Sequence, residues 1–180
     1  TIVEGLDHLV PAEDVAMSKT LERAFRRRGI GFTLGVRFAE AAQTADGVTV
    51  SLEDGSQLQA DYLLVAVGRG PATAGLGLEE AGVSLDRGFV VADERLQTSV
   101  PHVYAVGDIV PGLQLAHRSF QQGIFVAETI AGENPVIIPE QLIPRVAYSH
   151  PEVASVGLTE ARAAEVHGAD AVQAYEYNLA

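Results

Sequence analysis

The sequence contains no cysteine and no tryptophan, and it has a single methionine. Without cysteine the chain can form no disulfide, offers no thiolate nucleophile and supplies no zinc-thiolate ligand. Basic residues are scarce too, because 12 Lys and Arg stand against 24 Asp and Glu, for a formal net charge of −12. Nucleic acids and anionic membranes bind clustered cations, so neither is expected as a partner. The densest basic run, residues 26–28, precedes Gly29 and is typical of a helix end that complements the helix dipole.

Long apolar runs and targeting signals are also missing. No stretch reaches the ~18 apolar residues of a membrane span, and no signal-peptide pattern opens the chain. The default location is therefore the cytoplasm. The sequence is 47% apolar and 20% charged, which favours a globular protein over a disordered one. It opens directly in a strand pattern at residues 1–4 without a methionine, so we expect it to be a fragment of a longer protein.

Strand and helix patterns alternate along the rest of the chain. Strands are expected at residues 1–4, 31–39, 47–52, 56–58, 61–68, 89–91, 103–106, 145–149, 153–156 and 172–177, and helices at 14–28, 115–131 and from Thr159 to 166, with a helical turn at 75–82. Asp-Gly pairs at 46–47 and 54–55 predict the turns of a three-stranded antiparallel meander. The apolar run 61–68 is typical of a strand buried on both faces. The pattern predicts an α/β protein with more than one domain.

Two strand ends carry candidate nucleotide contacts. Glu4 ends an apolar strand that leads through a loop to a helix. In dinucleotide-binding folds an acid there accepts hydrogen bonds from both hydroxyls of an adenosine ribose and repels a 2′-phosphate. The alternative is a solvent-exposed glutamate. Gly68 ends the run 61–68, where backbone could approach a nucleotide closely; a plain strand-to-loop break is the alternative.

Asp108 has the strongest local pattern. It follows Gly107 at the carboxyl end of the strand pattern 103–106, which is where open α/β sheets bind ligands. A ribityl or sugar hydroxyl would satisfy its carboxylate, and an N-cap or loop hydrogen bond is the alternative. The helix that begins at about Leu115 directs unpaired amides to the same place, and these favour negative charge. His117 is more often a packed or capping histidine than a proton carrier.

The remaining motifs do not indicate a functional site. Residues 75–80 imitate a glycine-rich phosphate turn, but Glu80 stands where the third glycine belongs and no strand precedes the motif. His150 before Pro151 reads as structural. The chain shows no Ser-His-Asp order, no metal-ligand cluster and no paired acids. Taken residue by residue, it predicts a nucleotide-binding α/β protein with no complete active site and no metal.

Three segments resemble one family. Residues 98–108 (TSVPHVYAVGD) resemble the second flavin-binding segment of the pyridine nucleotide-disulfide oxidoreductases. Residues 114–117 (QLAH) are similar to the dihydrolipoamide dehydrogenase group of that family, because glutathione reductases tend to carry Leu-Thr-Pro there. Residues 148–160 look like the opening of the family's interface domain. The resemblance runs over the whole chain without large gaps.

The resemblance implies two cofactors, FAD and NAD. It assigns FAD binding to Asp108, Gln114, Leu115, Ala116 and His117, and NAD binding to Glu4 and Gly68. Asp108 would hold the ribityl chain, and the Ala116 and His117 amides would approach the pyrimidine end of the flavin. Negative charge on the reduced flavin would gain roughly 0.3–2 kcal/mol from the helix N-terminus.

The implied fold is a partial Rossmann-like dinucleotide-binding domain with an antiparallel meander, a returning FAD-domain segment and the start of an α+β interface domain. The expected boundaries are 1–75 for the later part of the NAD-binding domain, 76–135 for the second FAD-binding segment and 136–180 for the start of the dimerisation domain. Both glycine-rich phosphate turns, the redox cysteine pair and the His-Glu base of the family are expected outside this chain. We therefore assign no catalytic residue, and we expect the chain alone to be inactive.

The implied parent is an NAD-dependent enzyme that oxidises dihydrolipoyl groups through a redox disulfide and FAD. It would be a homodimer serving a 2-oxoacid dehydrogenase complex through lipoyl-bearing components. Two alternatives stay open: another flavoprotein disulfide reductase, or a non-catalytic nucleotide-binding or dimerisation domain. A Cys-x4-Cys motif upstream would favour an enzyme, and its absence would favour the binding domain.

Overall fold

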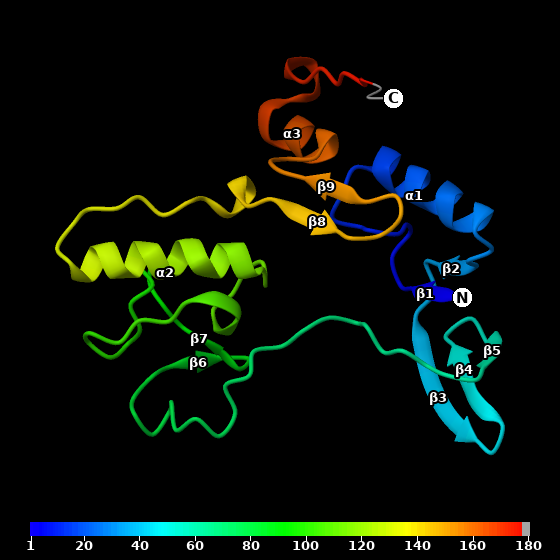
Figure 1. Ribbon diagram of the computed structural model, residues 1–180, viewed down its shortest axis with the longest axis horizontal. Helices are drawn as coiled ribbons and strands as arrows, with labels where there is room; N and C mark the ends of the chain where they lie inside the picture. The colour runs from blue at the N-terminus through cyan, green and yellow to red at the C-terminus, as the bar shows by residue number, and fades with distance from the viewer. Residues whose placement is uncertain (178–180) are drawn as a thin grey trace. The chain divides into compact units, whose positions relative to one another are not determined.

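The computed structural model describes residues 1–177 of the chain. Contacts divide the chain into two compact units, Thr1–Val65 with Pro144–Ala180, and Ala66–Ile143. Figure 1 shows the elements of both units. The boundaries expected from the sequence, at 75/76 and 135/136, divide the chain by function and stay a prediction.

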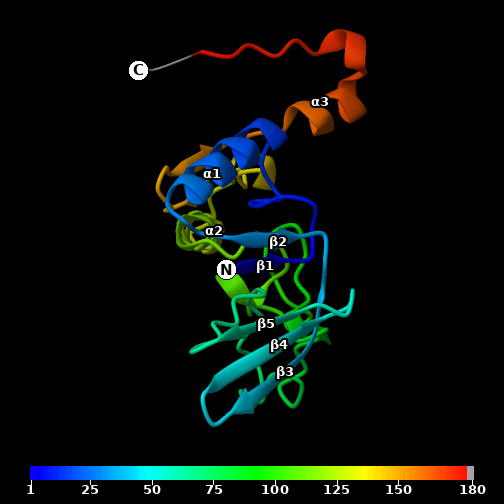
Figure 2. The ribbon, with the colours of Figure 1, turned by 90° about the vertical axis from the view of Figure 1, so that its right-hand side faces the viewer.

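A strand-helix-strand arrangement opens the first unit. It consists of β1 (Ile2–Glu4), α1 (Val15–Arg27) and β2 (Phe32–Leu34), and the two strands pair in parallel. Gly29 ends the helix region with a φ of +75°, which favours glycine over other residues. Leu21 of α1 is buried together with Leu9 and Val153, and side chains of β1 and β2 pack against this cluster. Figure 2 shows the ribbon of α1 beside the two strands. The predicted first strand and first helix are confirmed.

The meander of the first unit is antiparallel, as predicted. Its strands are β3 (Phe38–Thr44), β4 (Gly47–Leu52) and β5 (Gln57–Ala60), in the order β3-β4-β5. The prediction of one strand over 31–39 is wrong, because this stretch divides between β2, which pairs with β1, and β3, which pairs with β4. At the turn into β5, the hydroxyl and the amide of Ser56 donate hydrogen bonds of 2.7 and 2.9 Å to Asp54, and these bonds lower the pKa of its carboxyl.

A hairpin and a short helix complete the first unit. The strands β8 (Arg145–Ala147) and β9 (Val153–Ser155) pair antiparallel, and α3 (Glu160–His167) follows. Thr159 caps α3 as predicted, because its hydroxyl accepts a 3.2 Å hydrogen bond from the Arg162 amide. The last strand predicted, at 172–177, does not form. These residues have no strand partner within the described part of the chain.

The second unit holds the site region. Its elements are β6 (Leu85–Asp86), β7 (Phe89–Val90), the 3₁₀ turn η1 (Gly107–Ile109), α2 (Ala116–Ile130) and the 3₁₀ turn η2 (Glu140–Leu142). The two strands form a hairpin. Its core contains Val83, Val90, Ala105 and Val110, and η1 contacts α2. The predicted helix at 115–131 is confirmed.

Three predicted elements around this region are not formed. Residues 61–68 form no strand, and the side chains of Leu64 and Val67 are 87% and 90% exposed. Their sequence predicts burial on both faces, but the described residues provide no neighbouring strands to cover them. The predicted strand 103–106 makes only a single bridge, from Tyr104 to Gln97. Residues 75–82 form turns without a helix. Over residues 1–177, no helix has the length and apolar character needed to cross a membrane.

Candidate nucleotide-binding site

Asp108 lies in η1, at the end of the extended stretch that the sequence singled out. Its side chain is exposed, and within residues 1–177 its carboxylate has no hydrogen-bond partner. Its backbone carbonyl accepts a 3.3 Å hydrogen bond from the Gln114 side chain. The carboxylate therefore makes neither the capping nor the loop hydrogen bond that the sequence offered as the alternative. It is free to accept hydrogen bonds from a ligand.

Gly107 brings this turn close against α2. Its φ is +79°, and a Cβ at this position would lie 2.9 Å from the Ser119 hydroxyl. A larger residue would be strained at this φ and would require the Ser119 side chain to move. The glycine therefore sets the short separation between Asp108 and the first turns of α2.

The start of α2 carries the other predicted flavin contacts, Gln114, Leu115, Ala116 and His117. Leu115 is the N-cap residue, and no side chain caps the helix there. The first amides of a helix lack partners within the helix and carry partial positive charge. The structure thus brings Asp108 and residues 114–117 together, at one end of α2, as a pairing of hydrogen-bond acceptor and donors that suits a polar ligand.

The sequence reasoning missed three polar side chains behind this turn. Arg118 and Gln122 lie on the buried face of α2, and Glu140 approaches from η2. All three bond to the backbone of residues 107–113. A signal for the first two existed, because polar residues four apart share one helix face. No local signal existed for Glu140, whose approach depends on the path of the chain after α2.

Glu4 occupies the end of β1 in the first unit, as predicted. It is half-buried, and one carboxylate oxygen accepts a 2.9 Å hydrogen bond from the Leu6 amide. The second oxygen has no partner within residues 1–177. The carboxylate is therefore held in the turn after the strand with one oxygen available, which differs from a freely solvated glutamate.

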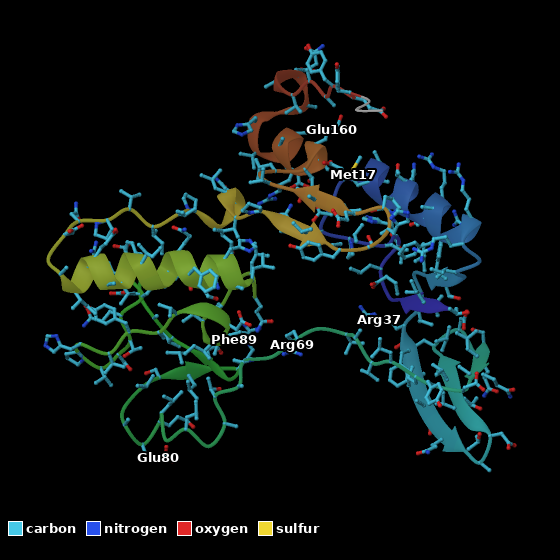
Figure 3. All side chains as sticks on the ribbon, in the orientation of Figure 1. Met17, Arg37, Arg69, Glu80, Phe89 and Glu160 are labelled. Atoms are coloured by element: carbon cyan, nitrogen blue, oxygen red, sulfur yellow. The ribbon has the colours of Figure 1, made fainter. Side chains whose placement is uncertain are left out.

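Gly68 and the rejected motif both lie in loops of the second unit. Gly68 has a φ of +127°, and a Cβ there would meet nothing within 4 Å. The position is open, but no described side chain gathers around it. Figure 3 shows Glu80 on the loop 75–82. Its side chain is exposed, and no strand leads into this loop.

Residues 1–177 contain no group of three His, Cys, Asp or Glu side chains that could hold a metal ion. The polar groups at the site are instead the Asp108 carboxylate and the backbone amides at the start of α2. These groups suit hydroxyls and the delocalised charge of an organic cofactor.

A parallel strand pair joined through a helix, an antiparallel meander and an exposed acid in a turn beside an uncapped helix start are typical of an α/β protein of the dinucleotide-binding class. The family described as pyridine nucleotide-disulphide oxidoreductase matches residues 1–123, and its dimerisation domain matches residues 143–180. The chain belongs to the pyridine nucleotide-disulphide oxidoreductase family. The family and the α/β fold class predicted from the sequence are confirmed.

Curated relatives are identical to this chain at about two-fifths of the aligned positions. Dihydrolipoyl dehydrogenase 3 of Pseudomonas putida is 41% identical over 165 residues, which are 89% of this chain and 35% of that protein. Dihydrolipoyl dehydrogenase of Chlorobaculum tepidum is 43% identical over 164 residues, again 89% of this chain and 35% of the relative. A dihydrolipoyl dehydrogenase of Bacillus subtilis is 42% identical over 178 residues, with 96% and 37% covered. The chain thus spans about a third of the length of these relatives.

Solved structures share the fold of this chain over the part that matches. LpdA of Mycobacterium tuberculosis matches with a TM-score of 0.83 and 30% identity, over 92% of this chain and 36% of that one. The HOCl-induced flavoprotein disulfide reductase RclA of Escherichia coli matches with a TM-score of 0.82 and 31% identity, over 91% of this chain and 38% of that one.

Proposed function

We propose that this chain is the central part of an NAD-dependent flavoprotein dihydrolipoyl dehydrogenase. The observation that carries the proposal is the exposed carboxylate of Asp108, which has no hydrogen-bond partner among residues 1–177, beside the uncapped start of α2. The run Leu115-Ala116-His117 at that start is the feature that favours this group of the family. Relatives with 41–43% identity that carry the name dihydrolipoyl dehydrogenase support the same choice.

The residues present fit the flavin. An exposed carboxylate accepts the hydroxyls of a ribityl chain, and the positive end of α2 stabilises negative charge on an aromatic ring system. Gly107 lets the turn that carries Asp108 lie close against α2, because a Cβ there would lie 2.9 Å from the Ser119 hydroxyl. FAD, when bound, supplies a two-electron acceptor between a dithiol and NAD⁺.

The proposed reaction converts a dihydrolipoyl dithiol to its disulfide and reduces NAD⁺ to NADH with release of one proton. No residue of this chain is assigned to the bond-making steps. Asp108 and the α2 amides bind and orient the flavin. Glu4 and Gly68 bind NAD, with the free oxygen of Glu4 accepting a ribose hydroxyl. Residues 1–75, 76–135 and 136–180 would then belong to the NAD-binding, FAD-binding and dimerisation domains.

A second candidate is another flavoprotein disulfide reductase. The likeness to RclA, a flavoprotein disulfide reductase, supports it. Glu4 disfavours the members that use NADP, because its carboxylate would repel a 2′-phosphate.

The complete protein that carries this chain tests both candidates. It is purified, its flavin is measured by visible absorbance, and dihydrolipoamide oxidation is followed as NADH formation. We expect stoichiometric FAD and NAD⁺-dependent oxidation of dihydrolipoamide. Bound FAD without this activity would favour the second candidate, and a protein without flavin would favour a binding or dimerisation domain.

We further propose that the complete protein is a homodimer that serves lipoyl-bearing components of a 2-oxoacid dehydrogenase complex. The match of residues 143–180 to a dimerisation domain supports the first part. The exposed Tyr148 and Val156 give this region apolar surface that a partner would cover. Light scattering is expected to give twice the subunit mass, and a monomer at micromolar concentration would contradict the dimer. The cytoplasmic location stays a prediction.

A further inference from the structure

Arg118 is the one buried cation among the Lys and Arg residues in the described part of the chain, with 8% of its surface exposed. It comes from the third position of α2, directly after the proposed flavin contacts. Burying a guanidinium is costly unless its donors find acceptors. The acceptors that Arg118 finds define what the side chain does.

Two of those acceptors are backbone carbonyls of the loop that carries Asp108, and the third is the Glu140 carboxylate. One terminal nitrogen donates to the Pro111 carbonyl at 2.6 Å, and the other donates to the Gly107 carbonyl at 3.4 Å. The Nε pairs with the Glu140 carboxylate at 3.2 Å. The planar guanidinium thus holds the loop before and after Asp108 with donors in a fixed, spread geometry that a compact ammonium lacks.

Glu140 and Gln122 hold the same loop at two further points. The Glu140 oxygen that pairs with Arg118 also accepts a 2.6 Å hydrogen bond from the Leu113 amide. The Gln122 side chain, one helical turn after Arg118, accepts a 2.7 Å hydrogen bond from the Gly107 amide. Both backbone groups of Gly107 are therefore fixed from α2.

Gly112 shows how closely the loop is fitted to this pair. Its φ is +121°, and a Cβ there would overlap both the Glu140 carboxylate and the Arg118 guanidinium. Any larger residue would have to displace the ion pair. The loop and the pair are therefore complementary, independently of the hydrogen bonds.

We infer that Arg118, held in place by its ion pair with Glu140, is a positioning residue of the flavin site. It fixes residues 107–113 so that the Asp108 carboxylate is aimed before the cofactor arrives. Asp108 has no side-chain partner of its own, so only its backbone can set its direction. A binding group that is already in place lowers the ordering cost of binding. The inference rests on the proposed flavin site.

The test uses the complete protein, freed of flavin and titrated with FAD. We expect Arg118→Met to weaken FAD binding about tenfold or more, because hydrogen bonds from a charged donor to the loop are lost. The visible circular dichroism of the FAD that does bind should also change, because the loop is no longer fixed. Arg118→Lys keeps the charge but not the fork, so it should restore part of the affinity. Gly112→Ala displaces the pair without removing it and should weaken binding as well.

Arg95→Met is the matched control. Arg95 also contacts α2, through a 3.2 Å hydrogen bond to Thr129 and its position 5.5 Å above the Phe125 ring. It makes no bond to residues 107–113. We expect this variant to lower the melting temperature of the flavin-free protein while FAD affinity stays within about threefold of wild type.

The outcomes separate the inference from the proposed function. Wild-type affinity and dichroism in both Arg118→Met and Gly112→Ala would overturn the positioning role while the flavin site stands. An equal loss in Arg95→Met would overturn it too, because the effect would then follow α2 packing in general. A wild-type protein that binds no FAD would remove the proposed function and this inference with it.

Discussion

The Asp108 carboxylate contributes no hydrogen bond to the described protein, so its removal should act on the ligand and spare the fold. In the complete protein we expect Asp108→Ala to lower flavin occupancy, with a stability change of the flavin-free protein within about 0.5 kcal/mol. Flavin absorbance measured against protein concentration gives the occupancy. Asp108→Asn keeps one acceptor oxygen, so its flavin occupancy should lie between those of the wild type and Asp108→Ala. Full flavin and full activity in Asp108→Ala would remove the ribityl role.

In the function proposed above, Glu4 would set the choice between NAD⁺ and NADP⁺. Its removal takes away a ribose acceptor that NAD⁺ uses and a charge that NADP⁺ must avoid. We therefore expect Glu4→Ala to lower kcat/KM for NAD⁺ about tenfold and to lower the value for NADP⁺ less. Steady-state kinetics with both cofactors measure this. Glu40→Ala, which removes an exposed glutamate of β3 in the same unit, is the control; equal losses for both cofactors in Glu4→Ala would remove the assigned role.

At the scale of residues, local pattern predicted that Glu4 ends a strand and that Asp108 lies beside a helix start, but not which side chains hold the Asp108 turn. Glu4, Gly68 and Asp108 could be proposed as site residues from local pattern, because a strand pattern, a glycine and a helix start can each be recognised within a few residues. The pairing of Arg118 with Glu140 depends on how the segment after α2 returns, and no local pattern encodes that path.

Among the elements, α3 tests the value of one cap. The helix has eight residues and no buried side chain. It depends on the Thr159 hydroxyl and on the Glu160 amide, which donates a 2.8 Å hydrogen bond to Asp14 (Figure 3 labels Glu160). We expect Thr159→Ala to cost about 1 kcal/mol and to raise amide exchange in α3 about fivefold, as measured by mass spectrometry on the complete protein. Thr159→Ser should exchange like wild type, and unchanged exchange in Thr159→Ala would show that the Thr159 cap does not hold the helix.

Elements whose partners lie within the described chain were predicted well. Both long helices, the meander and the hairpin of β8 and β9 have caps, turns or partners that neighbouring residues supply. The strand predicted at 61–68 has the composition of a buried central strand, yet its side chains are exposed. Composition reports the environment a segment suits, while pairing requires neighbours that the described residues do not contain.

At the scale of the whole molecule, part of the proposed site forms within one unit of this chain, and the rest is expected elsewhere in the protein. The chain spans about 35% of the length of its first two relatives, yet the site turn, the helix start and the ion pair behind them are formed in one unit. In the function proposed above, this unit would offer hydrogen bonds to one part of a flavin. The resemblance places the diphosphate turns, the cysteine pair and the His-Glu base outside the chain.

We therefore expect the 180-residue chain, purified alone, to be colourless and to show no NAD⁺-dependent dihydrolipoamide oxidation. Interactions at one end of FAD must still offset the whole cost of immobilising the ligand, on the order of 4–15 kcal/mol. The absorbance of the purified chain in the flavin band, measured beside the complete protein at equal concentration, decides the point. Far-UV circular dichroism checks that the isolated chain is folded, so that a colourless sample reports on the site. A folded chain with stoichiometric FAD would show that Asp108 and α2 suffice for binding and that the missing parts serve the chemistry alone.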